Sequence, residues 1–192
     1  MKIVAITGGI GSGKSTIAKM IQVIGYPVFY ADQQASTIID TDQGVKAKFT
    51  ELFGKEIYLE SGKLNRPLLA TIIFNNENAK QQVNSIVHPA VWEKFVSWSK
   101  TQTSRLVFME SAIIHECGWA DRFDKIICIT ADLETRIQRT ILRDNTTREK
   151  VVARINNQMS DAEKIEQSDF TIYTNEECFE IEQLLNTLEK IL

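Results

Sequence analysis

The sequence predicts an α/β protein built on a parallel five-stranded sheet, because short β-branched segments alternate with longer amphipathic ones along the whole chain. The short segments are too continuously apolar to face water on one side, which is typical of buried parallel strands joined by helices. A length of 192 residues, of which 43% are hydrophobic and 24% charged, suits one main domain with small insertions. We therefore expect a three-layer α/β/α core.

Five strands are predicted, at residues 2–7, 27–30, 105–109, 125–130 and 170–173. The first helix should cover residues 14–24, and its apolar face carries Ile17, Met20, Ile21 and Ile24. A later helix is expected to turn inward Leu133, Ile137, Thr140 and Ile141. The Ser/Thr-x-x-Glu spacing of a capping box predicts two helix starts, at Ser160 with Glu163 and at Thr174 with Glu177.

Two segments interrupt the alternation of strands and helices. Residues 43–100 contain helix-like segments with aromatic side chains but no convincing core strand, which predicts a helical insertion. Residues 139–158 carry Arg139, Arg143, Arg148 and Arg154. These arginines predict either a mobile lid that closes over a phosphoryl group or a solvated helix face, and a phosphate site nearby favours the lid. The core is then residues 1–42, 101–138 and 159–192.

A glycine-rich loop directly follows the first predicted strand. Residues 8–16, GGIGSGKST, match the phosphate-binding pattern G-x-x-x-x-G-K-[ST], in which backbone N–H groups wrap phosphate oxygens. The residues expected to bind ATP are Gly9, Gly11, Ser12, Gly13, Lys14, Ser15 and Thr16. Lys14 would reach the β- and γ-phosphates, Ser15 would ligate Mg²⁺, and the following helix N-terminus adds partial positive charge. A dinucleotide-binding loop is the alternative, but Lys14 and Ser15 suit a triphosphate better.

The remaining motifs narrow the chemistry to a small-molecule kinase of the P-loop type. The strings N-K-x-D, D-x-x-G and L-S-G-G-Q of switch GTPases and transporter ATPases do not occur. Asp32, after the second strand, is a candidate general base for the acceptor hydroxyl or an N-cap of the next helix. Glu110, at the end of the third strand, is a candidate Mg²⁺ ligand through water or a structural carboxylate. His88 precedes Pro89 at an expected helix start, and a lone histidine is more often structural than catalytic.

The motifs, in this order and spacing, resemble the dephospho-CoA kinase family over nearly the whole chain. The matching segments are residues 6–16, 31–32, 62–66, 74, 88–89, 116, 138–144, 154–158 and 164–172. The resemblance implies Mg²⁺-dependent transfer of a phosphoryl group from ATP to the ribose 3′-hydroxyl of dephospho-CoA. It also implies that the insertion binds CoA and that residues 139–158 form the lid. The chain departs from the family at Tyr30, where the family usually has an aspartate.

Individual site roles follow from the same resemblance. Asp32 matches the position of the base, and the substrate side matches Arg66, His88 and Glu116. Arg139 matches a catalytic lid position, and the ATP side matches Arg143 and Asn175, the latter displaced by one residue from the family's usual asparagine.

Composition restricts the partners and the compartment. Lys+Arg 22 against Asp+Glu 25 gives a net charge of −3, which argues against a nucleic-acid binder. Three cysteines without a C-x-x-C pair argue against a disulfide framework and favour the reducing cytoplasm. No apolar run approaches the ~20 residues of a bilayer-spanning helix, and no extended secretory signal is present. We expect a monomer or weak homo-oligomer. Two alternative functions are a kinase of another acceptor (nucleotide or polyol) and a non-catalytic nucleotide-binding regulator.

Overall fold

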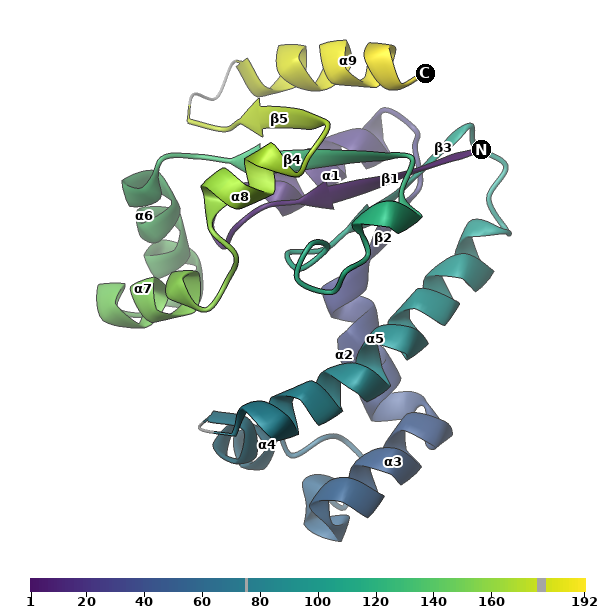
Figure 1. The fold of residues 1–192 in the computed structure, drawn as a ribbon, viewed down its shortest axis with the longest axis vertical. Coiled ribbons are helices and arrows are strands. Elements are labelled where there is room, and N and C mark those ends of the chain that lie inside the picture. The colour runs from purple at the N-terminus through teal and green to yellow at the C-terminus, as the bar shows by residue number, and fades with distance from the viewer. Residues whose placement is uncertain (75, 176–178) are drawn as a thin grey trace. The chain divides into compact units, whose positions relative to one another are not determined.

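The structure is a computed structural model that describes residues 1–74, 76–175 and 179–192 (Figure 1). The described chain divides into two compact units, and each is described by itself. The first unit comprises residues 1–30 and 102–192, and the second comprises Ala31–Thr101.

The described part of the first unit contains one parallel sheet of five strands, in the order β2-β3-β1-β4-β5. The strands are β1 (Lys2–Thr7), β2 (Val28–Tyr30), β3 (Leu106–Glu110), β4 (Lys125–Thr130) and β5 (Phe170–Tyr173). Each bound lies within one residue of the predicted one. The predicted fold class, an α/β protein with a five-stranded parallel sheet, is confirmed.

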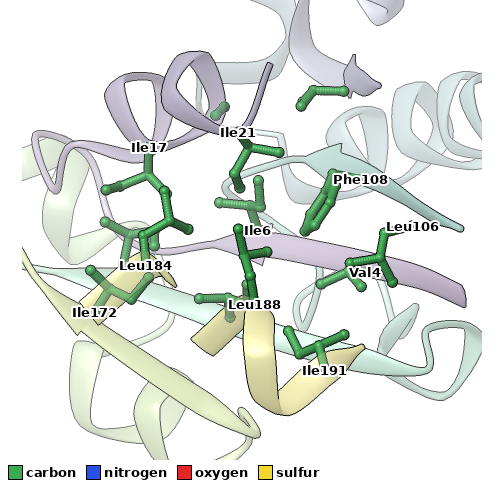
Figure 2. Close-up of a cluster of buried hydrophobic side chains, with 14 residues drawn as sticks. Val4, Ile6, Ile17, Ile21, Leu106, Phe108, Ile172, Leu184, Leu188 and Ile191 are labelled. Atoms are coloured by element: carbon green, nitrogen blue, oxygen red, sulfur yellow. The ribbon is translucent and has the colours of Figure 1, made fainter. Parts of the chain in front are cut away.

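Helices of the first unit cover the sheet and extend beyond it. They are α1 (Lys14–Val23), η2 (Ala120–Arg122), α6 (Leu133–Asp144), α7 (Arg148–Asn156), α8 (Asp161–Glu166) and α9 (Phe179–Ile191). Figure 2 shows the main core, where side chains of α1 and α9 point toward β1. Ile17 and Ile21 come from α1, Leu184 and Leu188 from α9, and Ile6 from β1. This cluster fixes the start of α1, and with it the glycine-rich loop, to the carboxyl end of β1.

The predicted helix faces are partly right. Ile17 and Ile21 are fully buried, but Ile24 is 44% exposed because α1 ends at Val23. In α6 the prediction for Leu133 is wrong, because this side chain is 53% exposed while the charged Arg136 is turned inward and only 2% exposed.

The two predicted helix starts have different outcomes. The capping box of Ser160 and Glu163 at the start of α8 is confirmed, with both reciprocal hydrogen bonds present. The second box depends on Glu177, which lies outside the described residues.

The second unit is helical, with one isolated antiparallel bridge between Tyr58 and Leu64. Its elements are α2 (Ala31–Thr41), α3 (Gln43–Phe53), η1 (Lys55–Ile57), α4 (Arg66–Phe74) and α5 (Glu77–Ser99). The unit begins at Ala31, earlier than the predicted insertion at residue 43, because α2 packs against α5 and α3. Among the described residues, no helix combines the length and apolar character needed to cross a membrane.

The expected helix start at His88 and Pro89 is wrong. Both residues lie in the middle of α5, which continues through Pro89. Proline has no N–H to donate to the carbonyl of Ser85 four residues earlier, so the helix loses one backbone hydrogen bond there. Val87, Val91 and Phe95 on the same helix are buried, and their packing keeps α5 continuous.

Candidate active site

The glycine-rich loop between β1 and α1 has a backbone that requires glycine. Gly8, Gly11 and Gly13 have φ angles of +144°, +76° and +91°, a region that other residues rarely adopt. A Cβ atom on Gly11 would also meet Thr140 Oγ1 at 2.7 Å. Gly13 begins α1, and its carbonyl accepts hydrogen bonds from Thr16 N (3.0 Å) and Ile17 N (3.1 Å). The loop therefore turns directly into a helix N-terminus.

The start of α1 presents a positive pole. Its first turn contains no acidic residue that would offset the helix dipole. Lys14 folds back over the loop and donates from Nζ to the carbonyl of Gly9 at 2.9 Å. Ser15 and Thr16 are exposed at the first turn. The predicted anion site thus has exposed groups and a cation at a helix N-terminus.

Ser12 contributes differently from the other loop residues. Its side chain is fully buried, and its hydroxyl has no hydrogen-bond partner. The N–H of Ser12 closes a turn to the carbonyl of Gly9 at 3.3 Å, and its own carbonyl accepts from Thr174 Oγ1 at 2.8 Å. Ser12 therefore shapes the loop from inside.

Thr174, just after β5, connects the loop to the predicted catalytic arginine. Its buried hydroxyl donates to Ser12 O and accepts from Arg139 Nη1, both at 2.8 Å. Arg139 Nη2 also donates to the carbonyl of Thr174 at 2.5 Å. Thr174 thus bridges the guanidinium of Arg139 and the backbone of the phosphate loop at Ser12. Sequence reasoning assigned Thr174 to a helix start with Glu177 and missed its contacts with the loop and with Arg139.

A second arginine of α6, Arg136, was also missed. Its Nε donates to the carbonyl of Ile10, at the tip of the loop, at 2.9 Å, and its guanidinium pairs with Asp161. The available signal was the spacing of Arg136 and Thr140, which places both on the helix face that the loop contacts.

The other lid arginines are paired with carboxylates. Asp144 bridges Arg143 and Arg154, with a shortest separation of 2.7 Å in each pair. Hydrogen bonds from Arg143 and then Arg154 hold the pKa of Asp144 well below its usual range. Arg148 pairs with Glu134 on α6 at 2.6 Å. The predicted lid segment therefore runs from the second half of α6 through α7 to Gln158, and exposed ion pairs join α7 to both ends of α6.

Asn175 is placed at the beginning of α6. Its Oδ1 accepts a hydrogen bond from the N–H of Asp132, the N-cap of α6, at 2.8 Å. Asn175 is exposed, next to the buried Thr174.

Glu110 ends β3 inside the sheet, next to both neighbouring strands. It is in register with Ile6 of β1 and Tyr30 of β2, and it is only 6% exposed. Burial, and secondarily the charge of Glu110, raise the pKa of Tyr30. The carboxylate of Glu110 and the hydroxyl of Ser15 are hard oxygen donors of the kind that Mg²⁺ prefers, so the residues present fit this ion.

Glu116 forms an ion pair with Lys164 and contacts Met159, in the segment that follows α7. Its Oε1 accepts from Lys164 Nζ at 2.6 Å and from the N–H of Met159 at 3.2 Å. Lys164 is completely buried and also donates to the carbonyl of Ala112 at 2.7 Å. The structure thus gives Glu116 a structural partner.

Three of the predicted acceptor-side residues, Asp32, Arg66 and His88, belong to the second unit, whereas Glu116 belongs to the first. Asp32 lies in the first turn of α2, which begins at Ala31, so the expectation that it is an N-cap is wrong. Arg66 Nη2 donates to Ser36 Oγ at 2.7 Å and lies 3.5 Å from Asp40 Oδ2. Asp32, Ser36 and Asp40 follow each other at one-turn intervals of α2, which places Arg66 along the same face. His88 is half-buried in α5, and burial lowers its pKa.

The chain has the fold of known P-loop kinases. A dephospho-CoA kinase from Campylobacter jejuni superposes with a TM-score of 0.71 at 24% identity, covering 98% of this chain and 96% of the other. A shikimate kinase from Acinetobacter baumannii gives a TM-score of 0.58 at 14% identity, covering 100% and 93%. This likeness shows the fold that the chain shares with these two kinases.

The family is defined by closer matches. The dephospho-CoA kinase family model matches residues 2–180. A dephospho-CoA kinase from Bacteroides fragilis is 40% identical over 186 residues, covering 96% of this chain and 90% of the relative. One from Listeria innocua is 32% identical over 195 residues, covering 100% and 98%. A solved structure from Thermus thermophilus has a TM-score of 0.90 at 30% identity, covering 100% and 97%. The chain belongs to the dephospho-CoA kinase family.

Proposed function

We propose that the protein transfers the γ-phosphoryl group of ATP to the ribose 3′-hydroxyl of dephospho-CoA, forming CoA and ADP in the last step of coenzyme A synthesis. The observation that carries this proposal is the phosphate loop, with Lys14 at a helix N-terminus whose first turn has no acidic residue, in a chain that matches the family over residues 2–180. The oxygen of the 3′-hydroxyl forms a bond to the γ-phosphorus of ATP. The bond between the γ-phosphorus and the oxygen that bridges it to the β-phosphate breaks, and the hydroxyl proton passes to a carboxylate.

The donor side of the reaction belongs to the first unit. The backbone N–H groups of the loop, Lys14 and the start of α1 neutralise the triphosphate and the charge that spreads in the transition state. Arg139, held by Thr174 beside the loop, is suited to the same task. Ser15 and Glu110 would hold Mg²⁺, which supplies charge neutralisation at the phosphate oxygens when bound.

The lid contributes arginines that already have a carboxylate as counterion. In the proposed reaction, Arg143 exchanges Asp144 for the nucleotide, and the exposed guanidinium pair is in keeping with such an exchange. Asn175 is proposed to contact the nucleotide through its side-chain amide nitrogen, since its Oδ1 accepts the hydrogen bond from Asp132 at the start of α6. Closure of this segment would exclude water, which otherwise competes with the acceptor hydroxyl.

On the acceptor side, Asp32 is the proposed general base. Its carboxylate follows the carboxyl end of β2 by two residues, the end of a parallel sheet at which ligands bind in open α/β folds. Arg66, His88 and Glu116 are proposed to contact dephospho-CoA. Proton removal by a base accounts for about 10²–10⁴ of the rate, and positioning and electrostatics supply most of the remainder. We also propose a cytoplasmic monomer or weak homo-oligomer that needs no nucleic-acid or membrane partner.

An acceptor screen tests the proposal. The purified protein is incubated with ATP, Mg²⁺ and one acceptor at a time: dephospho-CoA, a nucleoside monophosphate, or a small polyol. ADP release is followed by a coupled assay, and the product is compared with authentic CoA by chromatography. We expect turnover with dephospho-CoA and a product identical to CoA. Turnover only with another acceptor would contradict the assigned substrate, and ATP binding without any transfer would contradict the enzymatic function.

A further inference from the structure

A charged side chain with no assigned role lies directly behind the tip of the phosphate loop. Arg136 is 2% exposed and is the largest of the fully buried side chains in the described residues. Its Nε donates to the carbonyl of Ile10 at 2.9 Å, and its Nη1 pairs with Asp161, the first residue of α8. A buried guanidinium is retained at a cost in solvation, which its partners must offset.

The peptide groups of Ile10 are held from both sides. Gln158 Oε1 accepts a hydrogen bond from the N–H of Ile10 at 3.0 Å, while Arg136 binds the carbonyl of the same residue. Ile10 is the third residue of the nine-residue motif, between glycines that offer no side-chain contacts of their own. With both bonds in place, neither peptide unit at the loop tip is free to rotate, which fixes the direction of the neighbouring N–H groups.

The glycines of the motif are fitted to Arg136. A Cβ atom on Gly9 would collide with the guanidinium of Arg136, and one on Gly11 would collide with the Arg136 carbonyl. Thr140 Oγ1 donates to that carbonyl at 2.8 Å and fixes its direction. Gly9 and Gly11 are therefore needed partly so that the loop can lie against α6.

We infer that Arg136, Gln158 and Asp161 form a latch that positions the phosphate loop and couples it to the lid. Gln158 is the last residue of the predicted lid segment, and Asp161 follows three residues later. Movement of α7 therefore pulls on residues 158–161, which bind the Ile10 N–H directly through Gln158 and its carbonyl indirectly, through the pairing of Asp161 with Arg136. Arg136 and its partners are positioning residues that act through the loop backbone, and this inference rests on the proposed phosphoryl transfer.

Paired substitutions separate the effect of losing each hydrogen bond to Ile10 from the effect of a general loss of stability. Gln158→Ala removes the acceptor for Ile10 N–H, whereas Gln158→Glu keeps an acceptor oxygen in place. Arg136→Gln removes the guanidinium, whereas Arg136→Lys keeps the positive charge toward Asp161 but lacks the planar fork that also reaches Ile10. The control is Asp169→Asn, which breaks the ion pair with Lys125 at the start of β4; Asp169 is 34% exposed, close to the 30% of Asp161.

The expected result is a larger fall in kcat than in Mg·ATP affinity. A loop displaced by about 1 Å misaligns the γ-phosphate and lowers kcat by about 10²-fold in Gln158→Ala and Arg136→Gln. Gln158→Glu should restore kcat to near the original value, and Arg136→Lys should not. Urea unfolding of each variant gives the folded fraction. Loss of activity only in proportion to loss of folded protein, or full activity in Arg136→Gln, would overturn the inference.

A measurement independent of the acceptor keeps the latch distinct from the proposed function. Hydrogen exchange at the Ile10 amide, followed by NMR in the absence of dephospho-CoA, should accelerate about tenfold or more in Gln158→Ala and remain slow in Gln158→Glu and Asp169→Asn. Equal exchange in the original protein and in Gln158→Ala would overturn the latch. Failure of the original protein to phosphorylate dephospho-CoA would instead overturn the proposed function and leave this readout intact.

Discussion

Thr174 offers a sharp test of how the phosphate loop is supported. The hydroxyl of this buried residue donates to Ser12 O and accepts from Arg139 Nη1, both at 2.8 Å. Thr174→Val keeps the shape of the side chain and removes both hydrogen bonds, together with a longer one of 3.4 Å to the carbonyl of Thr130. It leaves Ser12 with an unpaired carbonyl, and it leaves Arg139 with only its bond to the Thr174 carbonyl.

The expected loss of stability follows from these two bonds. A neutral hydrogen bond contributes about 0.5–1.5 kcal/mol, and one to a charged group about 1.5–3 kcal/mol. Arg139 is half-buried and regains part of its bond from water, so the second contribution falls at the lower end of its range. We therefore expect Thr174→Val to lower the free energy of unfolding by about 2–3 kcal/mol.

The assay is urea unfolding of Thr174→Val beside Thr174→Ser. The serine variant keeps the hydroxyl and loses one methyl group, which costs about 1 kcal/mol. Calorimetric titration with Mg·ATP should show weaker binding for Thr174→Val than for Thr174→Ser, because the loop carbonyl and Arg139 are both released. Equal stability and equal ATP affinity of the two variants would refute this account of the loop's support.

Other substitutions test the remaining parts of the site. Lys14→Met should weaken Mg·ATP binding in calorimetry and also lower kcat, because its charge meets the phosphates in both the ground and transition states; a change in only one of the two would contradict its role. Asp32→Asn should lower kcat by about 10²–10⁴ with ATP affinity retained, and an equal loss of ATP binding would make Asp32 a structural residue. Glu116→Ala should cost about 3–5 kcal/mol in urea unfolding because it removes the carboxylate partner of the buried ammonium of Lys164, and adding Lys164→Met should recover part of the loss; no recovery would show that the pair is not coupled. Burial, then Lys164, lower the pKa of His115 below 6.5, so the unfolded state binds more protons and stability falls as the pH drops through about 6.5; His115→Phe should flatten this part of the stability curve, and an unchanged slope would argue against the buried neutral imidazole.

The strands and the phosphate loop could be predicted because their signals are local. β3 and β4 are almost entirely buried, and a strand buried on both faces has few alternatives, whereas the edge strand β5 is only partly buried and was found from its β-branched and aromatic residues. The loop motif carries its own geometry, since Gly8, Gly11 and Gly13 occupy positive φ angles that the pattern anticipates.

Arg136 could not be predicted as a buried residue because its burial depends on contacts distant in sequence. Its partners Ile10 and Asp161 lie 126 residues before it and 25 residues after it along the chain. Charged side chains are ordinarily expected at the surface, and the helical spacing of apolar residues assigned Leu133 to the buried face instead. Tertiary pairing with the loop decided which side of α6 turns inward.

Helix α5 and Asp32 show that local signals also fail to fix where a helix begins and ends. Proline and the residue before it usually mark a helix boundary, yet buried Val87, Val91 and Phe95 on both sides of Pro89 keep the helix intact. Asp32 was considered as a general base or an N-cap, and the N-cap prediction failed because helix boundaries shift by one or two residues without changing the hydrophobic pattern.

The central claim is that the loop at residues 8–16 holds a triphosphate whose terminal group passes to dephospho-CoA. It is tested most directly by incubating the protein with ATP labelled at the γ-phosphate, Mg²⁺ and dephospho-CoA, and locating the label in the products. We expect the label on the 3′-position of CoA with the original protein and none there with Lys14→Met. Label recovered only as inorganic phosphate, or transfer that persists undiminished without Lys14, would contradict it.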